Sequence, residues 1–389
     1  MPDTGIMKAM IGQVLRDSIG RRGIPAVAAM VATPDETTYA GAFGKLDSTS
    51  GIDLKFDSIF DIASMTKAVT TAAVLQLVEQ GKVKLSEPVS AYLPRLSKPE
   101  VLTGFDDTGQ PVLRPARKAI TLHHLLTHTS GLAYSIWDEG MSKFSSFRKS
   151  RPTLMFEPGA RWQYGPSLDW AGRLVEAVSG LTLEQYFQRN IFEPLGMKDT
   201  SFIFPAAKFG RLVGSSCRQP DGSLKEDART LPDPPKEYNG GGGLFSTAPD
   251  YVLFMQMILR QGRGADGGQI LQPKSVAAMT ANQIGSLSAG KLKTFRPGTS
   301  GDVDFHPGFT DGFTYGFLIN HEAFPDGRSA GSLTWAGIGN TFFWIDPKCS
   351  RCAVLMMQFM PFMDPQAIGL LGEFEKAVYP GRTGKVFAR

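Results

Sequence analysis

Residues 64–81 begin with Ser64-Met65-Thr66-Lys67 and continue as AVTTAAVLQLVEQG, and this motif is the sharpest local signal in the chain. Ala, Val and Leu recur at three- and four-residue steps, which predicts a helix over Ser64–Gln80 that ends at Gly81. Ser64 stands where the helix begins, so its hydroxyl can face outward and its backbone N–H has no helical partner. Lys67 lies on the same helix face. A lysine that accepts the hydroxyl proton makes such a serine a nucleophile. The alternative interpretation of the motif is a serine that caps the helix, followed by a lysine on the surface.

The length and composition of the chain argue against several classes of protein. The 389 residues exceed what one core usually supports, so we expect two structural units. The net charge is only +4, and the Lys and Arg residues are scattered, which argues against a nucleic-acid partner. No apolar run reaches the ~18–20 residues of a membrane helix, and residues 1–20 lack the apolar core of a signal peptide. We therefore expect no membrane association and a cytoplasmic location.

The order of the predicted elements indicates a discontinuous domain. A helix over residues 6–19 and two strands open the chain, helices fill its middle, and strands followed by a helix close it. The predicted strands cover residues 26–33, 37–43, 313–320, 330–335, 341–345 and 353–359. This order favours an α+β fold in which residues 1–84 and 236–389 form one sheet domain and residues 85–235 form an inserted, mainly helical domain. The polar, glycine-rich stretch 284–312 is expected to be a long loop, and loops of that length are usually either functional or disordered.

Tyr164 is the second candidate for chemistry. It lies in Tyr164-Gly-Pro-Ser167, where a loop runs into a helix. A phenolate at such a junction near Lys67 could act as the general base, although a tyrosine at a helix start is also a common packing residue. The chain has no GxSxG motif, so the sequence gives no support to a nucleophile-elbow hydrolase.

Three further patterns resemble ligand-binding motifs, but a structural role of their residues explains each of them better. His124 and His128 are four residues apart, like two zinc ligands on a helix, but the HExxH glutamate and a third ligand are missing. Cys349 and Cys352 form a lone CxxC, which we interpret as reduced structural thiols. The run Gly240–Gly243 lacks the GK[ST] ending of a phosphate loop, and close backbone approach explains its glycines. We therefore expect no metal and no cofactor.

Taken together, these segments resemble the serine β-lactamase and penicillin-binding-protein superfamily, most of all the family VIII carboxylesterases within its class C-like branch. The joint order of the motifs over residues 26–359 is far more specific than any one of them. They are Ser64-Met-Thr-Lys67, Leu125–Leu132, Glu157-Pro-Gly159, Tyr164, Glu193–Met197, Gly240–Leu244 with Ser246–Ala248, and Trp335-Ala-Gly337.

The resemblance implies an antiparallel β-sheet flanked by helices, with the active site in the cleft between this sheet and the helical domain. It implies that Ser64 is acylated while Lys67 and Tyr164 share the general-base work. The backbone N–H groups of Ser64 and Ile338 would form the oxyanion hole.

Two departures from the β-lactamase pattern bear on the substrate. The triplet Trp335-Ala336-Gly337 stands where β-lactamases have Lys-Thr-Gly, so the lysine charge that holds a substrate carboxylate is missing. Pro166 replaces the asparagine two residues after the tyrosine, and it offers no side-chain donor. Both changes weaken recognition of charged amides and leave the acylation residues in place.

The sequence therefore predicts a serine carboxylesterase that hydrolyses small, largely uncharged, short-chain esters. Its partner would be the small-molecule ester alone, and the oligomeric state stays open. The alternatives are a weak β-lactamase, an acyltransferase with the same Ser-Lys-Tyr residues, and an inactive binding protein of this fold. The candidate pocket walls are Tyr134, Trp137, Phe245 and Trp335.

Overall fold

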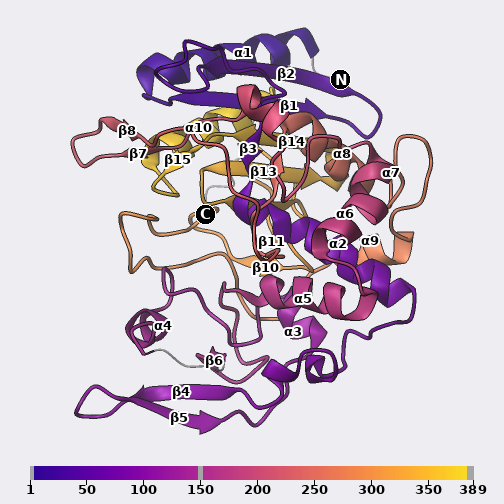
Figure 1. The fold of residues 1–389 in the computed structure, drawn as a ribbon. Coiled ribbons are helices and arrows are strands. Elements are labelled where there is room, and N and C mark those ends of the chain that lie inside the picture. Colours follow the sequence, from indigo (N-terminus) through magenta and orange to yellow (C-terminus); the bar gives the residue numbers. More distant parts are fainter. Residues whose placement is uncertain (1–3, 148–151, 383–389) are drawn as a thin grey trace, which may run out of the picture.

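The computed structural model describes residues 4–147 and 152–382 and is built around a seven-stranded antiparallel sheet (Figure 1). The strand order is β10-β11-β12-β13-β14-β1-β2. The strands are β10 (Asp311–Phe313), β11 (Leu318–Asn320), β12 (Leu333–Gly337), β13 (Thr341–Asp346), β14 (Arg351–Met356), β1 (Ala26–Ala32) and β2 (Thr37–Gly44). Strand β1 pairs with β14, with Ala28 opposite Met356, so one sheet joins the two ends of the chain. The predicted fold class is confirmed.

Helices cover both faces of this sheet. Phe343 of β13 contacts Tyr251 of α8 (Ala248–Leu259), with ring centroids 5.0 Å apart. Its neighbour Trp344 contacts Phe374 of α10 (Pro365–Val378) at 5.4 Å. Successive strand residues point to opposite faces, so α8 and α10 lie on opposite sides of the sheet. Helix α1 (Thr4–Arg21) packs beside α10.

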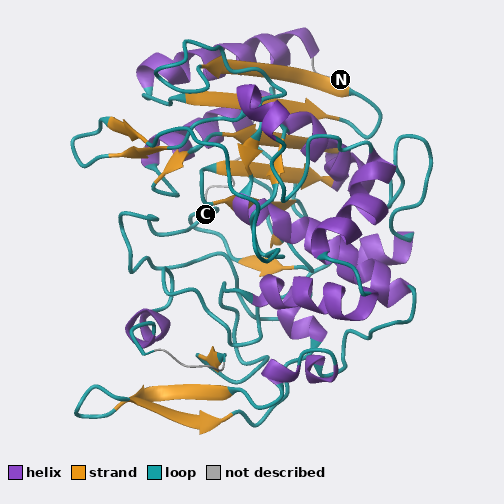
Figure 2. Cartoon of the chain, in the orientation of Figure 1, coloured by secondary structure: helices purple, strands orange, loops and turns teal. Residues whose placement is uncertain are grey.

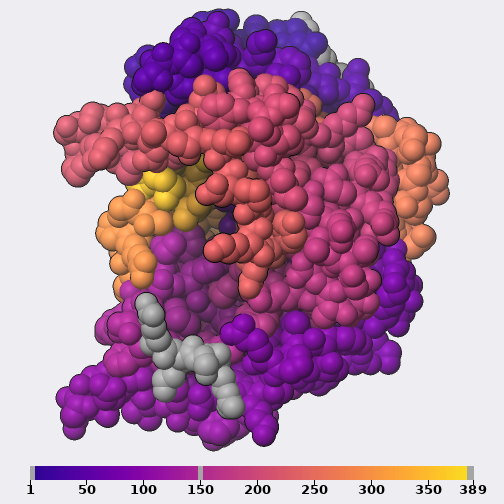
Figure 3. Space-filling view, in the orientation of Figure 1, coloured from indigo at the N-terminus to yellow at the C-terminus, as the bar shows by residue number. Residues whose placement is uncertain are grey.

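Most of the remaining helices gather beside the sheet around α2 (Thr66–Glu79), which packs on α5 (Ser167–Ser179), whereas α4 lies apart from them near β6 (Figures 1 and 2). Strands β4, β5 and β6 form a small sheet at the end of the molecule beyond α3 (Figure 1). Chain segments far apart in sequence border a hollow on the face seen in Figure 3. None of the described helices is long and apolar enough to cross a membrane. The other elements are α3 (Leu122–Leu126), α4 (Glu139–Phe144), α6 (Leu183–Phe187), α7 (Glu193–Leu195), α9 (Pro273–Thr280), β3 (Phe60–Asp61), β4 (Glu100–Phe105), β5 (Pro111–Pro115), β6 (Thr153–Leu154), β7 (Ser216–Arg218), β8 (Leu224–Glu226), β9 (Phe245–Ser246) and β15 (Phe359–Met360).

Some elements differ from those that the sequence predicts. The stretch 313–320 is not one strand, because the chain turns between β10 and β11. Gly316 sits in this turn at φ +92°, and a Cβ there would lie 2.7 Å from Thr71 Oγ1. The β4–β5 hairpin falls inside a stretch expected to be mainly helical. Strand β7, also in that stretch, pairs with β15 near the C-terminus, and the domain boundaries stay a prediction.

Candidate active site

Ser64 occupies a tight turn just before α2. The turn is a 3₁₀ segment, Ala63–Met65, so the regular helix begins two residues later than predicted. Ala63 adopts a left-handed φ of +41°, which is unfavourable for a residue with a Cβ. Its N–H donates to Asp61 Oδ1 at 2.8 Å, and Tyr251 Oη donates to the Met65 carbonyl at 3.0 Å. Contacts on both sides therefore hold the strained turn that presents Ser64.

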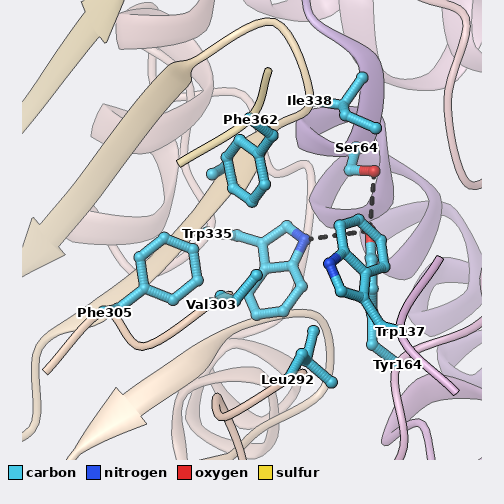
Figure 4. Close-up of a pocket in the computed structure, with 10 residues that line it drawn as sticks. Ser64, Trp137, Tyr164, Leu292, Val303, Phe305, Trp335, Ile338 and Phe362 are labelled. Atoms are coloured by element: carbon cyan, nitrogen blue, oxygen red, sulfur yellow. Dashed lines mark hydrogen bonds between the residues drawn. The ribbon is translucent and has the colours of Figure 1, made fainter. Parts of the chain in front are cut away.

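The structure brings Ser64, Lys67 and Tyr164 into contact. Tyr164 Oη donates to Ser64 Oγ at 2.7 Å, and Lys67 Nζ donates to the same oxygen at 3.1 Å (Figure 4). Lys67 is buried, and its Nζ also donates to the Gly241 carbonyl at 2.5 Å. Lys67 Nζ lies 4.9 Å from the centroid of the Tyr164 ring. Ser64 Oγ thus lies within hydrogen-bond distance of two groups, and either of them can accept its proton once it has given up its own.

Aromatic side chains fix the orientation of Tyr164. Its ring centroid lies 4.9 Å from those of His128 and Trp335, 5.2 Å from that of Tyr134 and 5.4 Å from that of Trp137. The Trp335 indole N–H donates to Tyr164 Oη at 3.4 Å, so this oxygen contacts both the indole and Ser64 Oγ (Figure 4). The phenol oxygen therefore has a restrained position between the indole and the serine.

An apolar pocket of about 300 Å³ opens at Ser64. Its only side-chain hydroxyls belong to Ser64 and Tyr164, and none of its lining residues is charged. The other lining residues are Trp137, Leu292, Val303, Phe305, Trp335, Ala336, Ile338 and Phe362 (Figure 4). Such walls accept an uncharged, apolar substrate group, because a buried charge without a partner is costly.

The structure places the remaining predicted site residues at different distances from this pocket. Trp137, Trp335, Ala336 and Ile338 line it, whereas Tyr134 packs behind Tyr164. Gly337 ends β12, where a Cβ would lie 2.5 Å from the Ile62 carbonyl oxygen.

Phe245 is not among the residues that line the pocket. It belongs to β9, which pairs with β3, and its ring lies 5.2 Å from that of Phe204 in a separate small apolar cluster. Nothing in the sequence distinguishes this phenylalanine from one that faces the cleft.

Ile338 directly follows β12 and meets Ser64 at the same pocket, which is the arrangement that an oxyanion hole from their two N–H groups requires. The hole itself stays a prediction. Its donors would have to lie about 2.7–3.1 Å from the oxyanion of the transition state.

Sequence reasoning missed several pocket walls. Leu292, Val303 and Phe305 come from the stretch 284–312, for which the sequence predicts only a long loop, either functional or disordered. Leu292 and Val303 exchange two backbone hydrogen bonds, at 3.0 and 2.8 Å. Next to Phe305, the buried His306 Nδ1 lies 2.7 Å from the Asp311 carboxylate. These contacts fix a segment that has no regular strand or helix.

His124 and the glycine run have structural roles, whereas both ring nitrogens of the buried His128 lack a hydrogen-bond partner among the described residues. His124 Nδ1 accepts the Thr121 N–H at 3.1 Å in a helix cap. Burial, followed by the charge of Lys67, holds the pKa of His128 well below 6.5. A Cβ at Gly240 would lie 2.4 Å from the Leu168 carbonyl oxygen, so the run allows close backbone approach. In the part of the chain that the structure describes, no group of three or more His, Cys, Asp or Glu side chains could hold a metal ion.

The chain matches the family model described as Beta-lactamase over residues 11–373. It belongs to the beta-lactamase family. The resemblance drawn from the motifs is therefore confirmed, and it extends to related acyltransferases and esterases of this family.

Two curated relatives carry different activities in their names. Monacolin J acid methylbutanoyltransferase of Aspergillus terreus is 35% identical over 354 residues, which cover 84% of this chain and 83% of the relative. Lovastatin esterase of Penicillium rubens is 34% identical over 337 residues, which cover 78% and 80%. This member of the beta-lactamase family is thus a serine hydrolase or acyltransferase.

Solved structures agree on the fold. The LovD6 mutant of simvastatin synthase from Aspergillus terreus superposes with a TM-score of 0.83 at 32% identity, covering 96% of this chain and 97% of its own. EstCE1, described as a hydrolase with promiscuous acyltransferase activity, superposes with a TM-score of 0.75, covering 97% and 99%. Because EstCE1 is only 22% identical to this chain, its similarity supports the fold alone.

Proposed function

We propose that this protein is a serine acyltransferase that passes a short, uncharged acyl group through Ser64 to an alcohol on a small hydrophobic molecule. Ester hydrolysis, the main prediction from the sequence, would be its side reaction when water replaces the alcohol. The observation that carries the proposal is the contact of Ser64 Oγ with both Tyr164 Oη and Lys67 Nζ at the floor of an apolar pocket.

The first half of the reaction forms the acyl-enzyme. Ser64 Oγ attacks the carbonyl carbon of the donor, and its proton passes to the Lys67–Tyr164 pair. The oxyanion receives hydrogen bonds from the backbone N–H groups of Ser64 and Ile338; losing one such donor typically costs ~10²–10³ in rate. The intermediate then collapses, the bond to the leaving group breaks, and the pair returns the proton to that group.

The second half runs the same steps in reverse with a new nucleophile. The acceptor hydroxyl loses its proton to the pair, its oxygen attacks the acyl carbon, the bond to Ser64 Oγ breaks, and the pair returns the proton to Ser64 Oγ. An acceptor with an apolar body gains binding energy from walls such as Trp137 and Phe362, which water does not. The pocket therefore favours an alcohol over water.

The named activities of the relatives support transfer better than hydrolysis. Besides the methylbutanoyltransferase of Aspergillus terreus, a methylbutanoyltransferase of Penicillium citrinum is 33% identical over 84% of this chain. The lovastatin esterase supports hydrolysis as an accessible second outcome. By analogy, we expect a short branched acyl group and an acceptor alcohol of the statin type.

Substitution of the nucleophile tests the proposal. We expect Ser64→Ala to abolish both p-nitrophenyl butyrate turnover and acylation of the protein, measured by absorbance and by intact mass. The exposed Ser97→Ala is the matched control and should behave as wild type. Turnover in Ser64→Ala close to that of wild type would disprove the assignment.

A further inference from the structure

Lys67 is a buried lysine that has no acidic side chain as a direct partner among the ion pairs of the described residues. Its Nζ is held by Ser64 Oγ and by the Gly241 carbonyl, and two tyrosine rings lie within 5.6 Å. The carbonyl contact, at 2.5 Å, is the shorter of the two hydrogen bonds. The position of Lys67 Nζ beside Ser64 therefore depends on how the Gly241 backbone is oriented.

Gly241 lies inside a run of four glycines, where the backbone has the greatest conformational freedom. One side chain restrains it: Asp169, in the first turn of α5, accepts the Gly241 N–H on Oδ1 at 3.0 Å. The approach is so close that a Cβ on Gly241 would lie 2.7 Å from this oxygen. The preceding Gly240 carbonyl is fixed as well, because it accepts Thr70 Oγ1–H at 2.6 Å.

The second oxygen of Asp169 reaches the other side of the site. Tyr134 Oη donates to Oδ2 at 3.3 Å. Burial, followed by the charge of Asp169, raises the pKa of Tyr134 well above 10, so its hydroxyl keeps the proton that it donates. The Tyr134 ring lies 5.2 Å from the Tyr164 ring and 5.6 Å from Lys67 Nζ.

We propose that Asp169 is a positioning residue for the acylation step: it fixes the Gly241 backbone so that its carbonyl holds Lys67 Nζ against Ser64 Oγ. The inference rests on the proposed function, since it presumes that Lys67 takes part in acylation. The role is geometric. A misplacement of a reacting group by 1 Å can cost about 10²-fold in rate.

Two substitutions of Asp169 separate this role from a general loss of stability. Asp169→Ala removes both acceptors, and we expect kcat for p-nitrophenyl butyrate to fall about 10–100-fold with KM changed less than about threefold. Asp169→Asn keeps an oxygen for the Gly241 N–H and should restore kcat to within about threefold of wild type, because the geometry is kept. The rate of Ser64 labelling by a fluorophosphonate should follow the same order.

The matched control is Glu237→Ala. This variant removes an exposed carboxylate that pairs at 2.7 Å with Arg173, which lies on α5 like Asp169. It should leave both rates as in wild type. An Asp169→Ala kcat within twofold of wild type, or an Asp169→Asn as slow as Asp169→Ala, would overturn the inference. If wild type itself leaves Ser64 unlabelled, the proposed function fails, which is a different and separately visible result.

Discussion

The two sides of the pocket are built in different ways. On one side, Ser64, Lys67 and Tyr164 come from the starts of two packed helices and hold one another by hydrogen bonds of 2.7 and 3.1 Å. On the other side, Leu292, Val303, Phe305 and Phe362 contribute only apolar surface, from segments between regular elements. The difference suggests that the polar side determines which reaction occurs and the apolar side determines which molecules undergo it.

Removing a proton carrier from the polar side should have the largest effect. Tyr164→Phe keeps the ring against Trp335 and Tyr134 but loses the hydroxyl 2.7 Å from Ser64 Oγ. We expect kcat/KM to fall about 10²–10⁴-fold, as for other general acid–base groups, equally for all acyl donors. Tyr92→Phe, which removes an exposed hydroxyl, is the control. A loss confined to one acyl chain length would show that Tyr164 acts in selectivity instead.

Widening the apolar side should change selectivity more than chemistry. Phe305→Ala enlarges the pocket, so we expect the ratio of kcat/KM for hexanoyl over butyryl p-nitrophenyl esters to rise about tenfold, since a methylene in a hydrophobic pocket changes rates by about 10–200-fold. Phe295→Ala, on the same segment but exposed and outside the lining, should leave the ratio unchanged. An equal fall for every chain length would contradict the division of roles between the two sides.

The smallest expected effect is a change in the pH dependence of stability, caused by His128 on the polar side of the pocket. Because the pKa of buried His128 lies well below 6.5, the unfolded chain binds more protons as the pH drops through 6.5. His128 therefore lowers the free energy of unfolding as the pH falls from 7 to 5. In His128→Asn, which tolerates the left-handed φ of +55°, we expect a weaker fall of Tm over this range than in wild type. The exposed His321→Asn should keep the wild-type slope, and an unchanged slope in His128→Asn would contradict a neutral buried His128.

The contrast between the polar and the apolar side of the pocket also explains which parts of the site the sequence could predict. The motif from Ser64 to Lys67 and the helix after it carry their geometry locally, because residues three apart share a helix face. Tyr164 was found by its place before a helix and by the family pattern. The helix that follows Tyr164 and the pairing of both chain ends in one sheet also follow from pattern and order.

The apolar walls could not be found in this way. Phe305 and Phe362 look like any core phenylalanine, and only tertiary contacts bring them to Ser64. Phe245 was expected to be a wall for the same reason and lies elsewhere. Asp169 was missed because its two partners, Gly241 and Tyr134, lie 72 and 35 residues away along the chain.

The central claim is that the acyl group on Ser64 passes to an alcohol in preference to water. The most direct test is to supply wild type with p-nitrophenyl butyrate and a hydrophobic alcohol, and to measure the new ester and free butyric acid by chromatography. We predict more ester than acid, with p-nitrophenol release equal to the sum of the two, and neither product above background with Ser64→Ala. Free acid as the only product, at alcohol concentrations that saturate the initial rate, would contradict the account and identify the protein as an esterase.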